Sequence, residues 1–183
     1  MSPPTTTRGR RRQLPRSEDE LADFALRYLE RFPTTATRLA DFLRRKMADA
    51  VAEGACDAHQ LTLWVAAVVQ RMIRARVLDD GEWAASRVRV LHRRGRSRPL
   101  IARDLAQHGL DQAVIGAAMR QLEVDHAEPD LEAALALARR RRLGPWAPPE
   151  RRREHRERHL AALARAGFSF DLARRVIDAA PTV

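Results

Sequence analysis

The amino-acid sequence predicts an all-α protein made of three tandem three-helix repeats. Apolar residues recur at intervals of three and four along most of the chain from residue 17 onward, which is the spacing of one helix face. No segment shows the sustained apolar–polar alternation of a β-strand. Because one three-helix repeat is too small to bury much apolar surface alone, we expect the repeats to pack end to end into an elongated, curved rod.

The first repeat is expected over residues 17–77. Ser17 and Glu20 have the spacing of a capping box, in which a hydroxyl accepts from the third helical amide and a carboxylate reaches back to the helix start. Pro33 ends this helix, because a proline disfavours helical geometry in the residue before it. A second helix follows, and the third begins near Leu61.

The second repeat is expected over residues 78–125. Asp79 begins its first helix as a cap, and Trp83 is expected in the buried stripe of that helix. Gly95 ends the helix, since glycine readily adopts the left-handed conformation found after helix ends. A second helix then leads to a third, which Asp111 caps.

The third repeat is expected over residues 126–183. Pro129 lies in the first turn of its first helix, a position that tolerates proline, and the Gly144-Pro pair ends that helix. Pro149 opens a second, long helix that closes at Gly167, and a short ninth helix follows near the C-terminal end.

The repeats are indicated by a constant offset between apolar positions. A shift of 62 residues aligns Ile101 with Leu39, and the same shift also matches the preceding helix. A shift of 58 residues aligns Leu105 with Leu163 and their downstream neighbours. One offset that holds across two helices is typical of a repeated unit rather than of chance matches.

Arginine dominates the charge, and the formal net charge is +10. A GC-rich genome would explain arginine in place of lysine, but it does not explain the positive excess. That excess points to a polyanionic partner, most simply nucleic acid or a nucleoprotein. Residues 1–16 contain five arginines, no acidic residue and little to bury, so we expect a disordered basic arm.

The chain is expected to be cytoplasmic and not membrane-bound. Cys56 is the single cysteine, so neither an intramolecular disulfide nor a zinc site of paired cysteines can form. The longest run without a charged residue has 13 residues, whereas a membrane span needs roughly 20 apolar residues. The N-terminal residues have no apolar stretch of the kind found in secretory signals.

Two short stretches have specific patterns. Residues 78–86 read LDDGEWAAS and are followed by Arg87 and Gly95, and residues 163–172 read LARAGFSFDL. In their order and spacing, these stretches resemble the central and C-terminal motifs of the RecX family of recombinase regulators, and the resemblance covers residues 18–180.

One position departs from that family. At the start of the middle helix of its second repeat, the family often has Gly-Pro, one further residue, a basic residue and isoleucine. Here Leu100 stands in place of the basic residue, which leaves Arg98 in the preceding turn as its substitute.

The resemblance implies a partner and an activity. Family members bind the RecA recombinase, chiefly its filament on single-stranded DNA. They modulate, and mainly inhibit, its ATP hydrolysis, strand exchange and co-protease activity. For this chain the resemblance therefore implies a regulator without a catalytic step of its own. We expect a monomer that needs no cofactor.

Two arginine clusters are the candidate binding residues, since the planar guanidinium binds both phosphate and carboxylate bidentately. The alternative is that they only cover solvated helix faces, and the dipole at a helix end explains part of the second cluster. The first cluster comprises Arg87, Arg89, Arg93, Arg94, Arg96, Arg98 and Arg103. The second comprises Arg139, Arg140, Arg141 and Arg142.

Catalytic and metal-binding motifs are not found in the sequence. It has no phosphate-binding glycine loop, no dinucleotide fingerprint and no nucleophile elbow. His155 and His159 are four residues apart, the spacing of a metal pair on one helix face, but the arginines around them would repel a cation. We therefore expect no enzyme activity and no metal site.

Two other functions remain open at this point. A stand-alone single-stranded DNA-binding module would use exposed aromatic rings as stacking platforms, whereas the aromatic residues here fall mostly in helical stripes. A purely structural helical adaptor would not respond to DNA at all.

Overall fold

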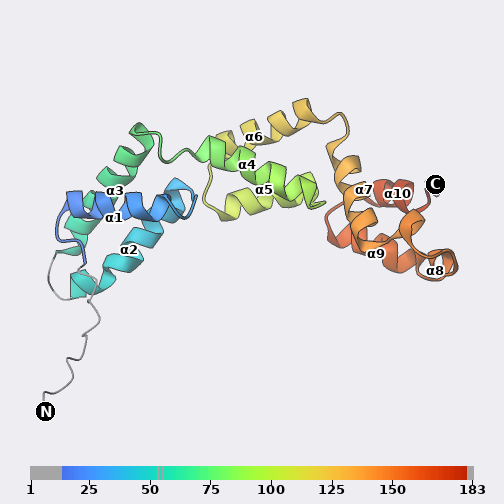
Figure 1. The fold of residues 1–183 in the computed structure, drawn as a ribbon, viewed down its shortest axis with the longest axis horizontal. Coiled ribbons are helices and arrows are strands. Elements are labelled where there is room, and N and C mark those ends of the chain that lie inside the picture. The colour runs from blue at the N-terminus through green and yellow to red at the C-terminus, as the bar shows by residue number, and fades with distance from the viewer. Residues whose placement is uncertain (1–13, 53, 55, 181–183) are drawn as a thin grey trace, which may run out of the picture. The chain divides into compact units, whose positions relative to one another are not determined.

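The computed structural model describes residues 14–52, 54 and 56–180, and in this part of the chain every regular element is a helix. The all-α prediction is therefore confirmed. Figure 1 shows the helices, which belong to two compact units, one up to Leu78 and one from Asp79 onward. No helix within the described residues is long and apolar enough to cross a membrane.

The first unit consists of helices α1 (Glu18–Leu29), α2 (Ala36–Ala52) and α3 (Ala58–Arg74). Ser17 caps α1 as predicted, since its hydroxyl accepts from the backbone N–H of Glu20 at 3.2 Å. All three helices contribute to one core. Its fully buried side chains include Leu21, Leu39, Leu43, Met47, Val65 and Val68.

Most of the predicted basic arm, residues 1–13, lies outside the described residues. The end of that segment is ordered on the first unit. Leu14 packs against the core, Pro15 is buried, and the backbone N–H of Arg16 donates to the carboxylate of Glu20 at 2.8 Å.

The second unit begins with α4 (Asp80–Arg93), α5 (Arg98–Gln107) and α6 (Gln112–Asp125). The predicted caps are present, because Asp79 accepts from the N–H of Glu82 at 2.9 Å and Asp111 from that of Val114 at 2.8 Å. Trp83 is only partly buried, contrary to expectation, because it lies at the edge of this core against the ring of His108, with 4.8 Å between ring centroids.

The C-terminal elements are α7 (Pro129–Arg141), a 3-10 turn (Gly144–Trp146), α8 (Pro149–Glu154), α9 (Arg156–Arg165) and α10 (Phe170–Ile177). The prediction of one long helix after Pro149 is wrong, since it is broken at His155. Arg152 binds the carbonyls of Pro145 and Ala147, both at 2.9 Å, which holds α8 against the preceding turn.

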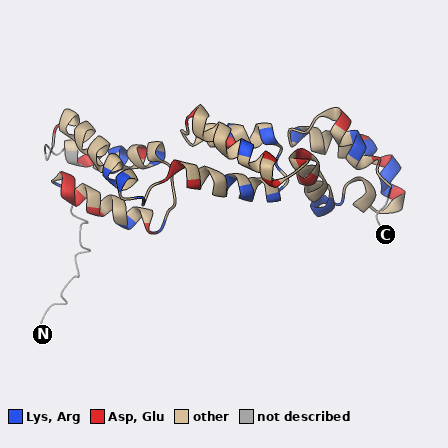
Figure 2. Ribbon diagram, turned by 90° about the horizontal axis from the view of Figure 1, so that it is seen from above, with Lys and Arg blue, Asp and Glu red and all other residues tan. Residues whose placement is uncertain are grey.

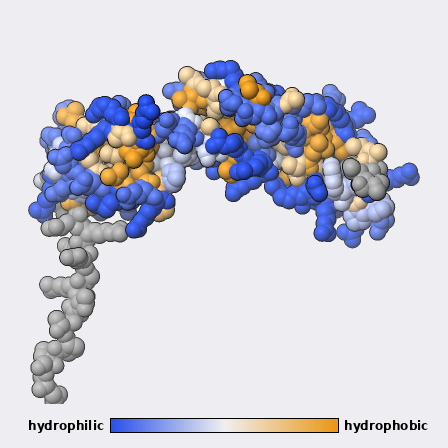
Figure 3. Space-filling model, turned by 45° about the horizontal axis from the view of Figure 1, so that its top comes forward, coloured by the Kyte–Doolittle hydropathy of each residue, from blue (hydrophilic) through white to orange (hydrophobic). Residues whose placement is uncertain are grey.

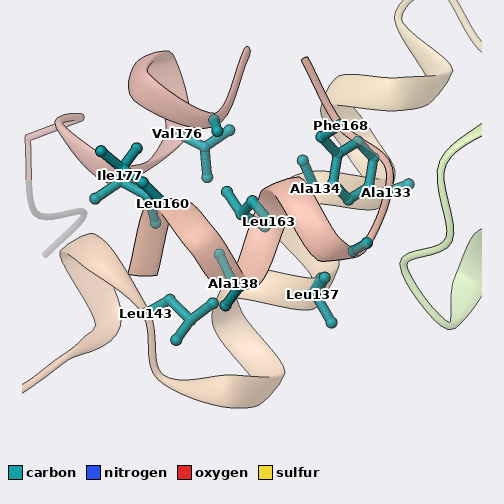
Figure 4. Packing of buried hydrophobic residues seen from close by; sticks show 13 residues of the cluster. Ala133, Ala134, Leu137, Ala138, Leu143, Leu160, Leu163, Phe168, Val176 and Ile177 are labelled. Atoms are coloured by element: carbon teal, nitrogen blue, oxygen red, sulfur yellow. The ribbon is translucent and has the colours of Figure 1, made fainter. Parts of the chain in front are cut away.

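The buried side chains of these C-terminal elements are mostly leucine and alanine, with Val176, Ile177 and Phe168 beside them (Figure 4). Leu163 of α9 is fully buried, with Val176 of α10 and Ala138 of α7 almost or entirely inaccessible as well. Phe168 lies at the same end of this cluster as Ala133 and Ala134 (Figure 4). The apolar stripes of α7, α9 and α10 are thus buried against one another.

Two glycines allow the C-terminal elements to approach α4 and α5 closely. A Cβ atom on Gly95 would lie 2.7 Å from the Cβ of Leu137 in α7. A Cβ atom on Gly167 would lie 2.3 Å from the Oγ of Ser97, which precedes α5. Both glycines have positive φ angles, +71° and +83°, a backbone conformation that residues with a side chain rarely adopt. The approach at Gly95 sets the position of the α4 end against α7, and that at Gly167 sets the loop after α9 against the start of α5.

Basic and acidic residues are interspersed along the helices of both units (Figure 2). Hydrophilic residues cover much of the visible surface, with apolar patches between them (Figure 3). The distribution of charge along the helices therefore does not locate a binding site. The criterion is a cluster of arginines that lie close together and form no ion pair with an acidic residue.

Candidate functional site

Arginines from the two predicted clusters meet in one hollow. Arg94 and Arg96, from the end of α4, line it together with Arg140 and Arg141, from the end of α7. Its volume is about 330 Å³, and the same hollow is lined by Gly95, Leu137 and Ala166. Arginines more than forty positions apart in the sequence thus line one hollow.

A second hollow of about 410 Å³ adjoins the first and shares Arg94 and Arg96 with it. Arg103 of α5 lines this second hollow, and so does Arg87 of α4 with its partner Asp104. Arg94, Arg96, Arg103, Arg140 and Arg141 are exposed, and we call these five residues the basic surface.

Helix termination explains why the basic surface forms here. The N–H of Arg96 donates to the carbonyl of Leu91 at 3.1 Å and that of Gly95 to His92 at 2.8 Å, the pattern of a helix closed by a left-handed glycine. The C-terminal ends of α4 and α7 both carry a partial negative charge from the helix dipole, which favours arginine there. The close approach at Gly95 then joins the two ends.

Arg87 forms an ion pair within the protein. Its Nε and Nη2 atoms donate to the two carboxylate oxygens of Asp104, each at 2.8 Å. This hydrogen bonding raises the pKa of Arg87 and lowers the pKa of Asp104, although burial opposes both shifts. Arg87 therefore links α4 to α5 and brings little net charge to the site.

Arg98 is likewise held by acidic residues. Its backbone N–H and its Nε donate to Asp130 at 2.8 and 3.1 Å, and its Nη1 donates to Glu123. The pKa of Arg98 is raised chiefly by the hydrogen bond to Asp130. Arg98 of α5 thus forms an intramolecular bridge to Glu123 of α6 and Asp130 of α7.

The remaining candidate arginines are exposed but do not line the two hollows. By helical periodicity, Arg89 and Arg93 project from the side of α4 opposite its buried residues. Arg139 lines a different hollow beside Trp146, and Arg142 follows α7 with a φ angle of 53°. The acidic partners of Arg87 and Arg98 could not be found from the sequence, because they lie on other helices.

The comparisons with known proteins agree with this fold. Residues 79–119 match the family model of the second three-helix domain of RecX. This match spans α4, α5 and part of α6 of the present chain. The chain is 35% identical over 175 residues to the regulatory protein RecX of Myxococcus xanthus, covering 95% of this chain and 92% of that protein. It is 30% identical over 164 residues to the regulatory protein RecX of Halorhodospira halophila, with 90% of each chain covered.

Two solved structures share the fold. The crystal structure of RecX from Lactobacillus salivarius has a TM-score of 0.62 at 19% sequence identity, covering 87% of this chain and 94% of that one. A second crystal structure of a regulatory protein RecX has a TM-score of 0.59 at 23% identity, covering 88% of this chain and 72% of the other. With the extended identity to RecX proteins over almost its whole length, the chain belongs to the RecX family of regulatory proteins.

Proposed function

We propose that this protein binds the RecA filament on single-stranded DNA in the cytoplasm and lowers its ATPase, strand-exchange and co-protease activities. Membership of a family of regulatory proteins named RecX supports this proposal. In this proposal the three-helix repeats act as a scaffold, and the protein has no catalytic step of its own.

The observation that carries the proposal is the gathering of Arg94, Arg96, Arg140 and Arg141 in one hollow. Within the part of the chain that the structure describes, no ion pair engages these four guanidinium groups, in contrast to those of Arg87 and Arg98. Phosphates of DNA and carboxylates on a protein filament both suit such a group of arginines.

The test is the ATPase activity of purified RecA on single-stranded DNA with sub-stoichiometric amounts of this protein. For the variant Arg94→Gln/Arg96→Gln/Arg140→Gln/Arg141→Gln, the concentration that gives half-maximal inhibition should rise at least about tenfold. This rise is equivalent to a loss of about 1.4 kcal/mol of binding free energy. A matched control removes the same charge elsewhere, as Arg89→Gln/Arg93→Gln/Arg151→Gln/Arg153→Gln. Equal loss of inhibition in both variants would show that inhibition depends on the total charge rather than on these four arginines, and normal inhibition by the four-arginine variant would place the contact elsewhere.

The alternative, a stand-alone DNA-binding module, predicts that excess bare single-stranded DNA strips the protein from filaments. We expect the filament to retain the protein instead. Tyr28 and Phe42 stack on each other with ring centroids 3.9 Å apart and pack against the first core, so their faces are partly covered. Among the described aromatic residues, Phe32 and Phe170 are the exposed ones.

A further inference from the structure

Three side chains able to ligate a metal converge in the second unit. His92 lies near the end of α4, His126 directly follows α6, and Glu132 lies in the first turn of α7. One ligand atom from each residue lies within 4.8 Å of the other two. The sequence separation of these residues hides the cluster, since His92 and His126 belong to different helices.

The ring of His92 is already oriented by its surroundings. His92 is only 6% exposed, and its Nε2 lies 2.7 Å from the carbonyl oxygen of Pro129. Because a carbonyl only accepts, Nε2 carries the proton, and the lone pair of the neutral ring is on Nδ1. A histidine that ligates a metal commonly donates its other ring N–H to such a carbonyl, which fixes the ring in place.

His126 and Glu132 complete the donor set. The Nδ1 of His126 is 2.6 Å from a carboxylate oxygen of Glu132, and the rings of His92 and His126 are 4.4 Å apart between centroids. Bonds of imidazole nitrogen and carboxylate oxygen to zinc are roughly 2.0–2.2 Å long. The side chain of Glu132 is 47% exposed, so it has room to rotate and admit an ion between its carboxylate and His126. The Nδ1 proton of His126 is then released to water, and the neutral ring keeps its proton on Nε2.

The surroundings favour a cation, in contrast to the arginine-rich His155–His159 pair. His126 borders a hollow of about 400 Å³ that Glu123, Glu128 and Asp130 also line. With Glu132, these make four carboxylates, against which Arg98 and Arg175 bring two positive charges.

We propose that His92, His126 and Glu132 form a binding site for a divalent transition-metal ion of the zinc class. Two imidazole nitrogens and one carboxylate suit zinc, cobalt and nickel rather than magnesium or calcium, which prefer oxygen ligands alone. The bound ion links the ends of α4 and α6 to the start of α7. It thereby ties the helices of the second predicted repeat to those of the third.

The test measures binding of Zn²⁺ and Co²⁺ to the full chain, purified without a histidine tag and freed of metal with a chelator. We expect one ion per chain by calorimetry, a Co²⁺ absorption band in the visible range, and a melting temperature that rises with metal. His126→Ala and Glu132→Gln should each weaken binding about tenfold or more, since each removes one of three ligands. Both residues lie near the surface, so circular dichroism should show unchanged helix content.

His155→Ala is the matched control, because it removes a histidine from the competing pair. It should bind metal as the unchanged protein does. Absence of binding at an ion concentration of about 100 µM, far above the range of protein zinc sites, would overturn the proposal. Loss of binding in His155→Ala with retention in His126→Ala would overturn it as well, by assigning the ion to the other pair.

Discussion

Gly95 lies directly against Leu137, so that a Cβ atom at position 95 would be 2.7 Å from the Cβ of Leu137 and 2.8 Å from the carbonyl oxygen of Ala133. Both neighbours belong to α7, and the backbone oxygen cannot move aside as a flexible side chain would. This contact joins the two helix ends that carry four of the five residues of the basic surface, Arg103 of α5 being the fifth. The sequence motif that ends α4 in glycine thus has a tertiary role as well as a local one.

We predict that Gly95→Ala destabilises the protein by about 2–4 kcal/mol, since it adds overpacking to the strain of a left-handed backbone. Urea denaturation followed by circular dichroism measures the change. Gly116→Ala is the control, because Gly116 is inside α6 and its added Cβ would meet only the end of the Arg120 side chain, at 3.3 Å. The control should be neutral or slightly stabilising, as alanine favours helix. Equal effects of both changes would contradict the role assigned to Gly95.

Arg98 is predicted to contribute to stability through its bridge to Asp130. Arg98→Ala should destabilise the protein by about 1 kcal/mol, a value reduced by the partial exposure of both side chains. A double-mutant cycle with Asp130→Ala, measured by urea denaturation, should give a coupling free energy of about 0.5–1 kcal/mol. Arg89→Ala should change stability by less than about 0.5 kcal/mol, and a coupling near zero would show that the bridge is not formed in solution.

The pair of Arg87 and Asp104 predicts a dependence of stability on pH. The hydrogen bond from Arg87 lowers the pKa of Asp104 in the folded protein below its ordinary value of 3.8. The folded state therefore binds fewer protons than the unfolded state as the pH falls, and the stabilisation present above the ordinary pKa is lost as the pH falls through the lowered one. The stability advantage over Arg87→Gln, about 0.5–1 kcal/mol near neutral pH, should vanish toward pH 2. Urea midpoints across this range check it, and an unchanging difference would contradict it.

Local sequence signals predicted the fold well because they act over a few residues. The caps at Ser17, Asp79 and Asp111 form the hydrogen bonds expected of them. The sequence did not predict the break at His155. Arg152 holds α8 against the preceding turn through the carbonyls of Pro145 and Ala147, and the spacing of apolar residues along one helix cannot show such a contact.

The candidate site was less predictable for the same physical reason. The sequence identified both arginine clusters but could not separate Arg94 and Arg96 from Arg87 and Arg98, whose acidic partners lie on other helices. Nothing in the sequence indicated that folding places the ring of His92 beside that of His126, because the two residues are 34 positions apart. Which charges are free and which are paired is decided by tertiary contacts.

The basic surface predicts how association with DNA-bound filaments depends on salt. Each arginine that neutralises a phosphate releases counterions, which contributes about 0.7 to the slope of log K against log salt concentration for a single strand. If Arg94, Arg96, Arg140 and Arg141 each contact a phosphate, replacing all four with glutamine should flatten the slope by about 3. Fluorescence anisotropy of labelled single-stranded DNA within the filament, from low to physiological salt, measures this slope.

The control Arg89→Gln/Arg93→Gln/Arg151→Gln/Arg153→Gln loses the same formal charge and should keep the original slope. A flattened slope in the control alone would move the phosphate contacts away from the basic surface. Loss of affinity in the four-arginine variant without a change of slope would instead indicate that these arginines bind carboxylates of the recombinase.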